Sequence, residues 1–294
     1  MKSGVKRTTP YKVISIIILV ILAILFLFPL YWIVTGAFKP TTDIYASQPV
    51  WWPSEWVTSN FEKLFTKRSA PLFEIGALVG PTVPAAIRWL VNTVFMSVAA
   101  MLLTCITAAM AGYALAKKRF VGRALLFSLI ICAMALPKQV ILIPLLKEMS
   151  ALKLYGSLWA VIFPTVGWPV GVFLMKQFCE GVPGEMLEAA RIDGASEART
   201  FTQIVVPLIK PGIGALAIFT FINSWNDYFM QLVMLPNSAN FTISLGIATL
   251  QGESSVDTGL LMSGAALAAV PIIVVFLIFQ KYFTQGITMG AVKG

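Results

Sequence analysis

The segment from residue 182 to residue 213 has the pattern best suited to a specific protein contact. It reads VPGEMLEAARIDGASEARTFTQIVVPLIKPGI. Pro183 suits the first turn of a helix, where its missing N–H is not needed, and Gly194 suits the left-handed position just past a helix end. Ser196 can cap a second helix through its side-chain oxygen. The pattern therefore predicts a short helix, a turn and a second helix.

Small and acidic side chains gather around the expected turn. Alanine and glycine let another protein surface approach closely, and the carboxylates offer charge to a basic partner. We expect six residues to form this contact: Glu188, Ala189, Ala190, Asp193, Gly194 and Ala195. A helix is stiff along its axis, so such a knob can transmit a push. The spacing alone also fits a linker helix that rests on the membrane surface.

A second polar group interrupts a long apolar run near residue 225. Asn223 and Asp227 are four residues apart and therefore share one helix face. Ionisable groups inside a membrane are costly and usually face a bundle interior or water. Tyr228 and Gln231 extend a polar and aromatic surface nearby. The candidates for a substrate path are Asn223, Trp225, Asn226, Asp227, Tyr228 and Gln231. Hydrogen bonding between helices, or at a helix break, is the alternative.

Lys138 is the other ionisable residue that interrupts an apolar run. We expect its stem to snorkel to the outer membrane interface. Prolines also lie in or near the apolar runs. Proline bends helices, and transporters use such bends near their gates. The prolines are Pro137, Pro144, Pro164, Pro169 and Pro271. Irregular packing explains these prolines equally well.

The chain lacks the residues of common catalytic and nucleotide-binding sites. It contains no His, no GxxxxGK[ST] phosphate loop and no HExxH motif. Cys105, Cys132 and Cys179 are not spaced as metal ligands, and we expect all three to be small buried hydrophobes. We therefore expect no catalytic residue, no metal site and no cofactor bound directly by this chain. The energy for any driven process must then come from a partner.

Composition places these segments in a membrane protein. Of the 294 residues, 58% are hydrophobic and 12% are charged, whereas a soluble domain carries about 25% charged residues. Six nearly uncharged windows can each cross a hydrocarbon core of about 30 Å as a helix. They are Val13–Phe38, Trp89–Ala116, Ala124–Leu146, Leu154–Met175, Pro211–Met234 and Thr258–Gln280. The predicted fold class is an all-α membrane protein with six transmembrane helices.

The positions of Lys and Arg predict an N-in, C-in orientation. The outer segment from Leu235 to Asp257 contains neither residue type, as expected when basic residues stay inside. The net charge of +9 then reflects topology, and we expect no binding to nucleic acid. The predicted divisions are a cytoplasmic N-terminus (1–12), a first transmembrane helix (13–38), an extracytoplasmic loop (39–87), a core (88–284) and a cytoplasmic tail (285–294).

The predicted outer loop contains Trp51, Trp52 and Trp56. Trp prefers the membrane–water interface, so these residues suit an anchor on the outer face. Contact with a partner protein that delivers substrate is the alternative.

The polar loop resembles the EAA loop of binding-protein-dependent ABC importer permeases. The pattern EAA–x2–DGA–x5–F–x2–I–x2–P–x3–P runs from Glu188 to Pro211. The resemblance implies a type I ABC importer permease fold from roughly residue 89 to the end. It also implies that the loop 182–213 is a coupling helix, which docks into a cleft on a separate ATPase subunit. ATP and Mg would then be bound by the partner ATPase subunits.

Two further stretches resemble the carbohydrate-importer branch, and within it the maltose-permease-G-like subunit. They are FINSWNDYF at 221–229 and QKYFTQGITMGAVKG at 280–294. In that branch the tail reaches the ATPase dimer interface, which implies contacts from Thr288, Met289, Gly290 and Ala291. The implied partners are a second homologous permease subunit in a heterodimer, two copies of an ATPase subunit and an extracytoplasmic solute-binding protein. The implied location is a bacterial plasma membrane.

The resemblance therefore predicts the uptake of a carbohydrate by alternating access. A polyol or glycerol phosphate is an alternative cargo within the same superfamily. An ion-driven secondary transporter fits less well, because such proteins are expected to show inverted repeats and acids near the midplane of both halves. Asp227 is the single acid within the predicted spans. A structural membrane protein would need no protruding turn of small residues.

Overall fold

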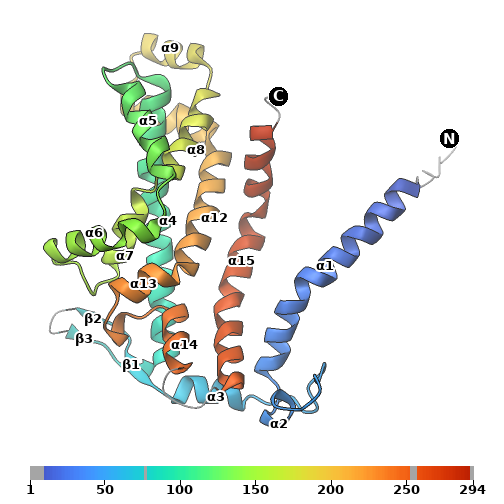
Figure 1. Cartoon of the computed structure of the whole chain (residues 1–294). Helices are drawn as coiled ribbons and strands as arrows, with labels where there is room; N and C mark the ends of the chain where they lie inside the picture. Colours follow the sequence, from blue (N-terminus) through green and yellow to red (C-terminus); the bar gives the residue numbers. More distant parts are fainter. Residues whose placement is uncertain (1–9, 76–77, 252–256, 292–294) are drawn as a thin grey trace.

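The computed structural model describes residues 10–75, 78–251 and 257–291, with the backbone alone described from 281 to 291. Long helices form its body (Figure 1). In the centre, α4 (Ala85–Lys117) packs against α8 (Pro169–Glu180) and α12 (Lys210–Asn226). In turn, α15 (Thr258–Ala291) packs between α12 and α1 (Pro10–Ala37). These contacts confirm the predicted all-α class for the body of the chain.

The predicted inner and outer segments lie at opposite ends of the molecule. Figure 1 places the N-terminal end of α1, the helix α9 (Gly184–Ile192) and the C-terminal end of α15 at one end. The other end holds α2 (Thr41–Ile44), α3 (Ser59–Thr66) and α14 (Ile243–Gln251). This separation agrees with the N-in, C-in expectation, and the orientation in the membrane remains a prediction.

The long outer loop is folded, which the sequence analysis did not anticipate. Strand β1 (Ser69–Pro71) pairs antiparallel with β4 (Thr82–Pro84), and β2 (Glu74–Ile75) pairs with β3 (Leu78–Val79). Strands of two or three residues are too short to leave an alternating pattern in the sequence. The buried Asn60 on α3 donates hydrogen bonds to the carbonyl oxygens of Ala37 and Lys39, so it fixes this loop to the end of α1.

The tryptophans of this loop cluster around the outer end of α1. The ring of Trp51 lies 5.9 Å from the rings of Phe28 and Trp32, and Trp52 lies 6.5 Å from Tyr31. All three loop tryptophans remain more than half exposed. The cluster therefore fits either an interfacial anchor or a protein contact.

Three of the predicted spans are each observed as two helices. Within the described residues, four helices are long and apolar enough to cross a membrane, or six spans form if each of two bent helix pairs counts once. The prediction of one helix across Ala124–Leu146 is wrong. There, α5 (Arg123–Met134) ends before Pro137, and α6 (Lys138–Ala151) leaves at 108°, because a residue that precedes proline disfavours the α conformation.

The other predicted windows match helices with shifted bounds. The window Leu154–Met175 is observed as α7 (Trp159–Val166) followed by α8. The window Pro211–Met234 is observed as α12 and the short α13 (Tyr228–Met234), with a break at Asp227. A hydropathy window detects apolar residues, but it does not detect a break in the helix within the apolar segment.

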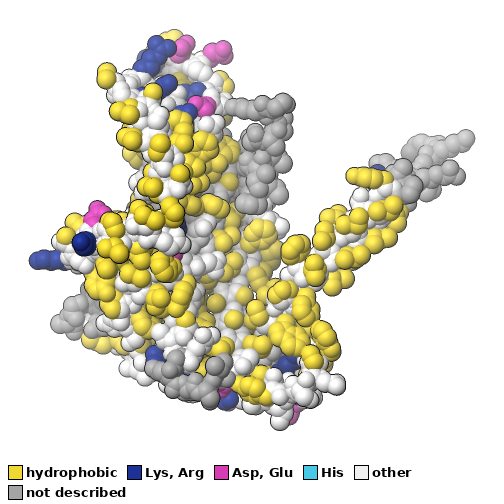
Figure 2. Space-filling model, in the orientation of Figure 1, with side chains coloured by type: hydrophobic (Ala, Val, Ile, Leu, Met, Phe, Trp, Pro, Cys, Tyr) yellow, Lys and Arg dark blue, Asp and Glu magenta, His cyan; other side chains and the backbone are white. Residues whose placement is uncertain are grey.

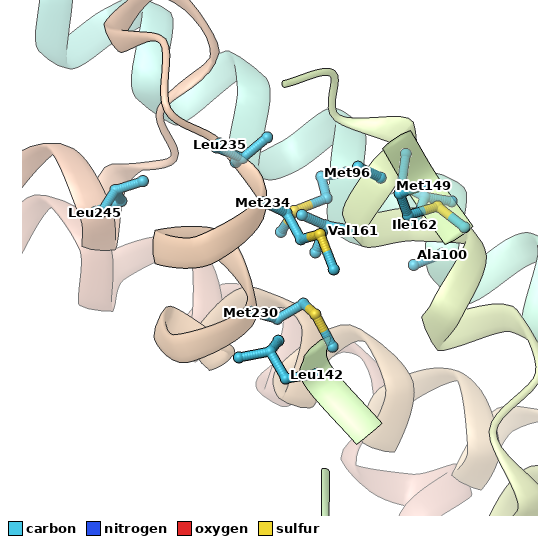
Figure 3. Packing of buried hydrophobic residues seen from close by; sticks show 11 residues of the cluster. Met96, Ala100, Leu142, Met149, Val161, Ile162, Met230, Met234, Leu235 and Leu245 are labelled. Carbon is cyan, nitrogen blue, oxygen red and sulfur yellow. The ribbon is translucent and has the colours of Figure 1, made fainter. Parts of the chain in front are cut away.

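A methionine-rich core holds the broken helices together. Figure 3 shows Met230 of α13 beside Leu142 of α6, and Met234 beside Val161 of α7. Methionine is flexible and fills the irregular gaps that helix breaks leave. A second core near α9 contains Cys105 and Cys179, both buried as predicted. Cys132 is exposed, contrary to prediction, because α5 buries no residue within this chain.

Apolar side chains cover much of the outer surface of this single chain. Along α1 the span Tyr11–Ala37 is not buried at all in its most apolar window, and Figure 2 shows hydrophobic side chains along its length. The same figure shows acidic and basic side chains gathered at the end that carries α9. The helices therefore suit contact with lipid or another membrane subunit, while the α9 end suits water.

Candidate functional site

The loop 182–213 forms the helix, turn and helix that its sequence predicts. Pro183 is extended, and α9 begins at the next residue. At the other end Gly194 has φ +74°, and the N–H groups of Gly194 and Ala195 donate to the carbonyls of Arg191 and Ala190 at 3.1 and 2.9 Å. This pair of hydrogen bonds is a Schellman motif, which requires a left-handed residue. The predicted left-handed conformation of Gly194 just past the end of α9 is confirmed.

The second short helix begins with the predicted cap. The Ser196 side chain accepts a hydrogen bond from the Arg199 N–H at 3.3 Å, and α10 (Glu197–Thr200) follows. All described hydrogen bonds that shape the turn therefore join residues at most five positions apart, between Ala189 and Arg199. The hydrogen bonds that define the turn are local in the sequence.

The six predicted contact residues divide by exposure. Glu188, Ala189, Asp193 and Gly194 are exposed, Ala195 is half-buried, and Ala190 is only 6% exposed. Ala190 therefore packs against its own chain and does not lie on the free surface. Ile192 is 86% exposed beside them, and the sequence analysis did not select it. The exposed surface near the turn thus combines the apolar Ile192 with the carboxylates of Glu188 and Asp193.

The C-terminal end of α4 holds both ends of this loop. The Lys117 Nζ donates to the carbonyl oxygens of Glu180 and Val182 at 3.1 and 2.7 Å, which lie at the end of α8. Lys118 forms an ion pair with Glu197 in the first turn of α10. A cation at a helix C-terminus and an anion at a helix N-terminus are both favourable for the helix dipole. The loop is therefore clamped to α4 on both sides of α9.

An aromatic contact extends the clamp. The ring of Tyr113 on α4 lies 5.4 Å from the ring of Phe201, and its hydroxyl donates to Glu197 at 3.2 Å. The Lys118 Nζ lies 5.1 Å from the centre of the Tyr113 ring. The hydrogen bond from Lys118 is the main reason that the pKa of Glu197 lies below its usual value. Phe201 of the EAA pattern thus has an identified structural partner.

The helix after the turn is irregular. Residues Phe201–Val205 form a π-helical turn, labelled η1, and the short α11 (Val206–Leu208) follows it. The pair Glu197–Leu208 and Lys210–Asn226 is bent by 77°. Pro207 cannot donate a backbone hydrogen bond inside a helix, and π-turns occur frequently at functional sites. This bend sets the angle between the loop and α12, which continues to the second polar group.

Three helix breaks meet near that polar group. Asp227 lies at the break between α12 and α13, where its Oδ1 accepts from the Met230 N–H at 3.3 Å and caps α13. Its Oδ2 lies 3.2 Å from the Nζ of Lys138, at the break between α5 and α6. Trp168, at the break between α7 and α8, lies with its ring centre 5.5 Å from the same Nζ. Lys138, which we expected to snorkel to the outer interface, thus forms an ion pair with Asp227 that the sequence analysis did not predict.

An aromatic stack adjoins the ion pair. The rings of Trp168 and Phe219 are nearly parallel, at 9°, and their centres are 5.0 Å apart. Phe219, Asn223 and Asp227 follow one another at four-residue spacing, so they share one face of α12. The sequence analysis missed Trp168 and Phe219, although Pro137 and Pro169 next to two of the breaks were recognised as signals for bends.

The six predicted path residues occupy two environments. Trp225 is 1% exposed, and the fully buried Gln231 donates to the Ser224 carbonyl at 3.1 Å and accepts a hydrogen bond from Thr242. These two side chains support the helix break from inside the chain. Four others reach the surface at least partly: Asn223, Asn226, Asp227 and Tyr228.

The predicted tail contacts lie at the end of the described chain. The backbone of Thr288, Met289, Gly290 and Ala291 continues α15, and their side chains lie outside the described part. Elsewhere in the described residues, no group of three or more His, Cys, Asp or Glu side chains is placed to hold a metal ion.

The coupling-type loop and the broken membrane helices together define a transporter permease. Residues 107–289 match the family model described as "Binding-protein-dependent transport system inner membrane component". The chain belongs to this family, so it is an inner-membrane component of a binding-protein-dependent transport system.

Individual relatives are similar over nearly their whole length. The chain is 34% identical to the arabinooligosaccharides transport system permease protein AraQ of Halalkalibacterium halodurans, over 93% of each chain. It is 28% identical to the trehalose transport system permease protein SugB of Mycobacterium tuberculosis, over 99% of this chain and 100% of that one.

A solved structure shares the fold. It is the crystal structure of a bacterial ABC transporter involved in the import of the acidic polysaccharide alginate, with a TM-score of 0.77 and 20% identity. The match covers 96% of this chain and 99% of the other. The fold is therefore that of an ABC importer permease.

Proposed function

We propose that this chain is one half of a heterodimeric ABC importer permease that takes up a carbohydrate delivered by a solute-binding protein. The observation that carries the proposal is the exposed helix α9, held by its Schellman turn at the end of the molecule opposite the folded outer loop (Figure 1). Relatives along the whole chain are named as permeases for arabinooligosaccharides and trehalose, which supports a carbohydrate cargo.

The exposed face of α9 is the proposed contact with the ATPase subunit. Glu188, Ala189, Ile192 and Asp193 offer small, apolar and acidic groups within two turns of helix. The clamp through Lys117 and Lys118 then passes any movement of α9 to α4, which packs against α8 and α12. A partner can shift the equilibrium between conformations only through interactions that differ between them. ATP-driven closure of the ATPase subunits supplies that difference at α9.

The proposed assembly has this chain, a second homologous permease, two ATPase subunits and an external binding protein. ATP and Mg are bound by the ATPase subunits. The tail, residues 285–294, is proposed as a second contact with the ATPase dimer. The exposed apolar surface of α1 suits lipid or the second permease.

Uptake into proteoliposomes tests the proposed function. The complete complex is reconstituted with its binding protein and supplied with radiolabelled arabinotriose, trehalose or maltose, and in parallel with sorbitol and glycerol 3-phosphate. We expect uptake of at least one of the three saccharides, dependent on ATP inside the vesicles. Uptake driven by an ion gradient without ATP, or uptake of sorbitol or glycerol 3-phosphate alone, would contradict the proposal.

A further inference from the structure

The three helix breaks lie at a similar depth in the membrane region. Helices α5 and α8 each contain twelve residues between their cytoplasmic ends and their breaks. At 1.5 Å per residue each covers about 18 Å, which is more than half of a hydrocarbon core of about 30 Å. The ion pair and the aromatic stack bring the α12 break to the same place.

A charged pair at this depth needs a polar neighbour outside the chain. The Lys138 side chain is 47% exposed on the surface of this chain, and that of Asp227 is 17% exposed. An ionised group that faced hydrocarbon would cost several kcal/mol. The apolar core beneath it, with Leu142 and Met230, leaves only the exposed side for polar contacts. The pair therefore faces a water-filled path or a polar ligand.

The groups around the pair match what a sugar ring requires. Trp168 and Phe219 provide a flat aromatic stack, against which the C–H face of a sugar can pack. Asp227 accepts hydrogen bonds from hydroxyl groups, Lys138 donates them, and the amide of Asn223 lies one turn away on the same face of α12. Such a combination suits a ligand with many hydroxyls and one apolar face.

We propose that Lys138, Trp168, Phe219 and Asp227 form a saccharide subsite in the middle of the translocation path, and that it favours uncharged over anionic saccharides. This inference rests on the proposed carbohydrate function and names the class of cargo. The preference follows from charge, because the ammonium of Lys138 is already neutralised by Asp227 at 3.2 Å. The carboxylate of Asp227 would repel an anionic sugar, and the paired Lys138 would not supply an additional positive charge to offset this repulsion.

Substitutions at the subsite test its role in transport. With arabinotriose-loaded binding protein at saturation, we expect Asp227→Asn to lower the initial uptake rate about tenfold, because hydrogen bonds to charged groups are worth about 1.5–3 kcal/mol. We expect Trp168→Ala to lower it about two- to tenfold, as loss of an aromatic contact implies. If arabinotriose is not transported by the wild type, trehalose or maltose replaces it as the probe.

The chain offers matched controls for both changes. Asp257 also lies 3.2 Å from a lysine, Lys63, and caps α15 through the Leu260 N–H, as Asp227 caps α13. The rings of Trp159 and Phe163 also stack, at 5.3 Å. Asp257→Asn and Trp159→Ala therefore remove equivalent contacts outside the subsite, and we expect uptake within twofold of wild type.

A change of selectivity separates a binding role from a structural one. Each variant is also supplied with the aldonate of the same saccharide, oxidised at its reducing end, after loading of the binding protein has been verified. Trehalose has no reducing end, so its uronate, oxidised at one C6, takes the place of the aldonate if trehalose is the probe. In Asp227→Asn the cation of Lys138 is no longer neutralised, so the ratio of aldonate to neutral uptake should rise at least threefold. In Asp257→Asn the ratio should stay at its wild-type value.

The outcomes distinguish the two proposals. If the wild type transports no saccharide, both the carbohydrate function and the subsite are overturned. If the wild type transports a saccharide, but the subsite variants match their controls in rate and selectivity, the subsite alone is overturned. Wild-type uptake of the aldonate as fast as the neutral sugar would overturn the charge preference.

Discussion

The coupling-type loop and the mid-membrane cluster are built in opposite ways. The turn at Gly194 is shaped by hydrogen bonds between residues at most five positions apart, such as Ala195 to Ala190, and the clamp from Lys117 and Lys118 attaches the loop to α4. The cluster depends on residues 89 positions apart, Lys138 and Asp227, brought together by three separate helix breaks. A local structure keeps its shape while it moves as a unit. A cluster made from several helices changes whenever those helices move, which suits a site that must open and close.

Proline at the turn after α9 should produce the largest effect, because it disrupts the local hydrogen bonds that shape the turn. Proline requires φ near −65°, whereas Gly194 has φ +74° and donates to Arg191. We expect Gly194→Pro to reduce ATP-dependent uptake more than tenfold, while ATP hydrolysis and assembly persist. Gly122→Pro is the control, since Gly122 also has a positive φ, +85°, in the turn that precedes α5. Equal loss of uptake in both variants would show that the loop has no special role.

The close contact between α4 and α8 at Gly112 should connect the coupling-type loop with the mid-membrane cluster. A Cβ on Gly112 would lie 2.7 Å from the backbone of Lys176 and Met175, so α4 and α8 could not keep their present spacing. We expect Gly112→Ala to destabilise the complex by about 1–3 kcal/mol, seen as a lower melting temperature in detergent. Gly167→Ala, where a Cβ meets nothing within 4 Å, should melt like the wild type. Unchanged melting of Gly112→Ala would mean that the helices separate without cost.

The clamp between α4 and α10 should show a smaller and reversible effect. Exposed ion pairs are worth about 0.2–1 kcal/mol, so Lys118→Glu or Glu197→Lys should lower the number of sugars imported per ATP by up to about fivefold. The double exchange should recover most of the loss, because it restores the pair with its charges reversed. Exchange of the pair Lys176 and Glu180, which lies within α8, should have no effect on coupling. Failure of the double exchange to recover would argue against the clamp.

The sequence predicted the locally determined parts most successfully. The cap at Gly194 and the second cap at Ser196 follow from residue type and spacing alone, and both are observed. The sequence analysis did not pair Lys138 with Asp227, because the two residues are 89 positions apart. Ala190 looked like a contact residue from its small size, yet its burial depends on how α9 packs. Long-range pairing and burial are properties of the fold that local patterns do not contain.

Cysteine crosslinking between neighbouring alanines tests the central claim most directly. In a complex whose three native cysteines are replaced by serine, Ala189→Cys is exposed on α9 and Ala190→Cys occupies a site that is 6% exposed. With a short bifunctional thiol reagent and single cysteines along the ATPase cleft, we predict strong crosslinking from position 189 and little from position 190. A complex that is active but yields no crosslink from position 189 to the ATPase would contradict the account.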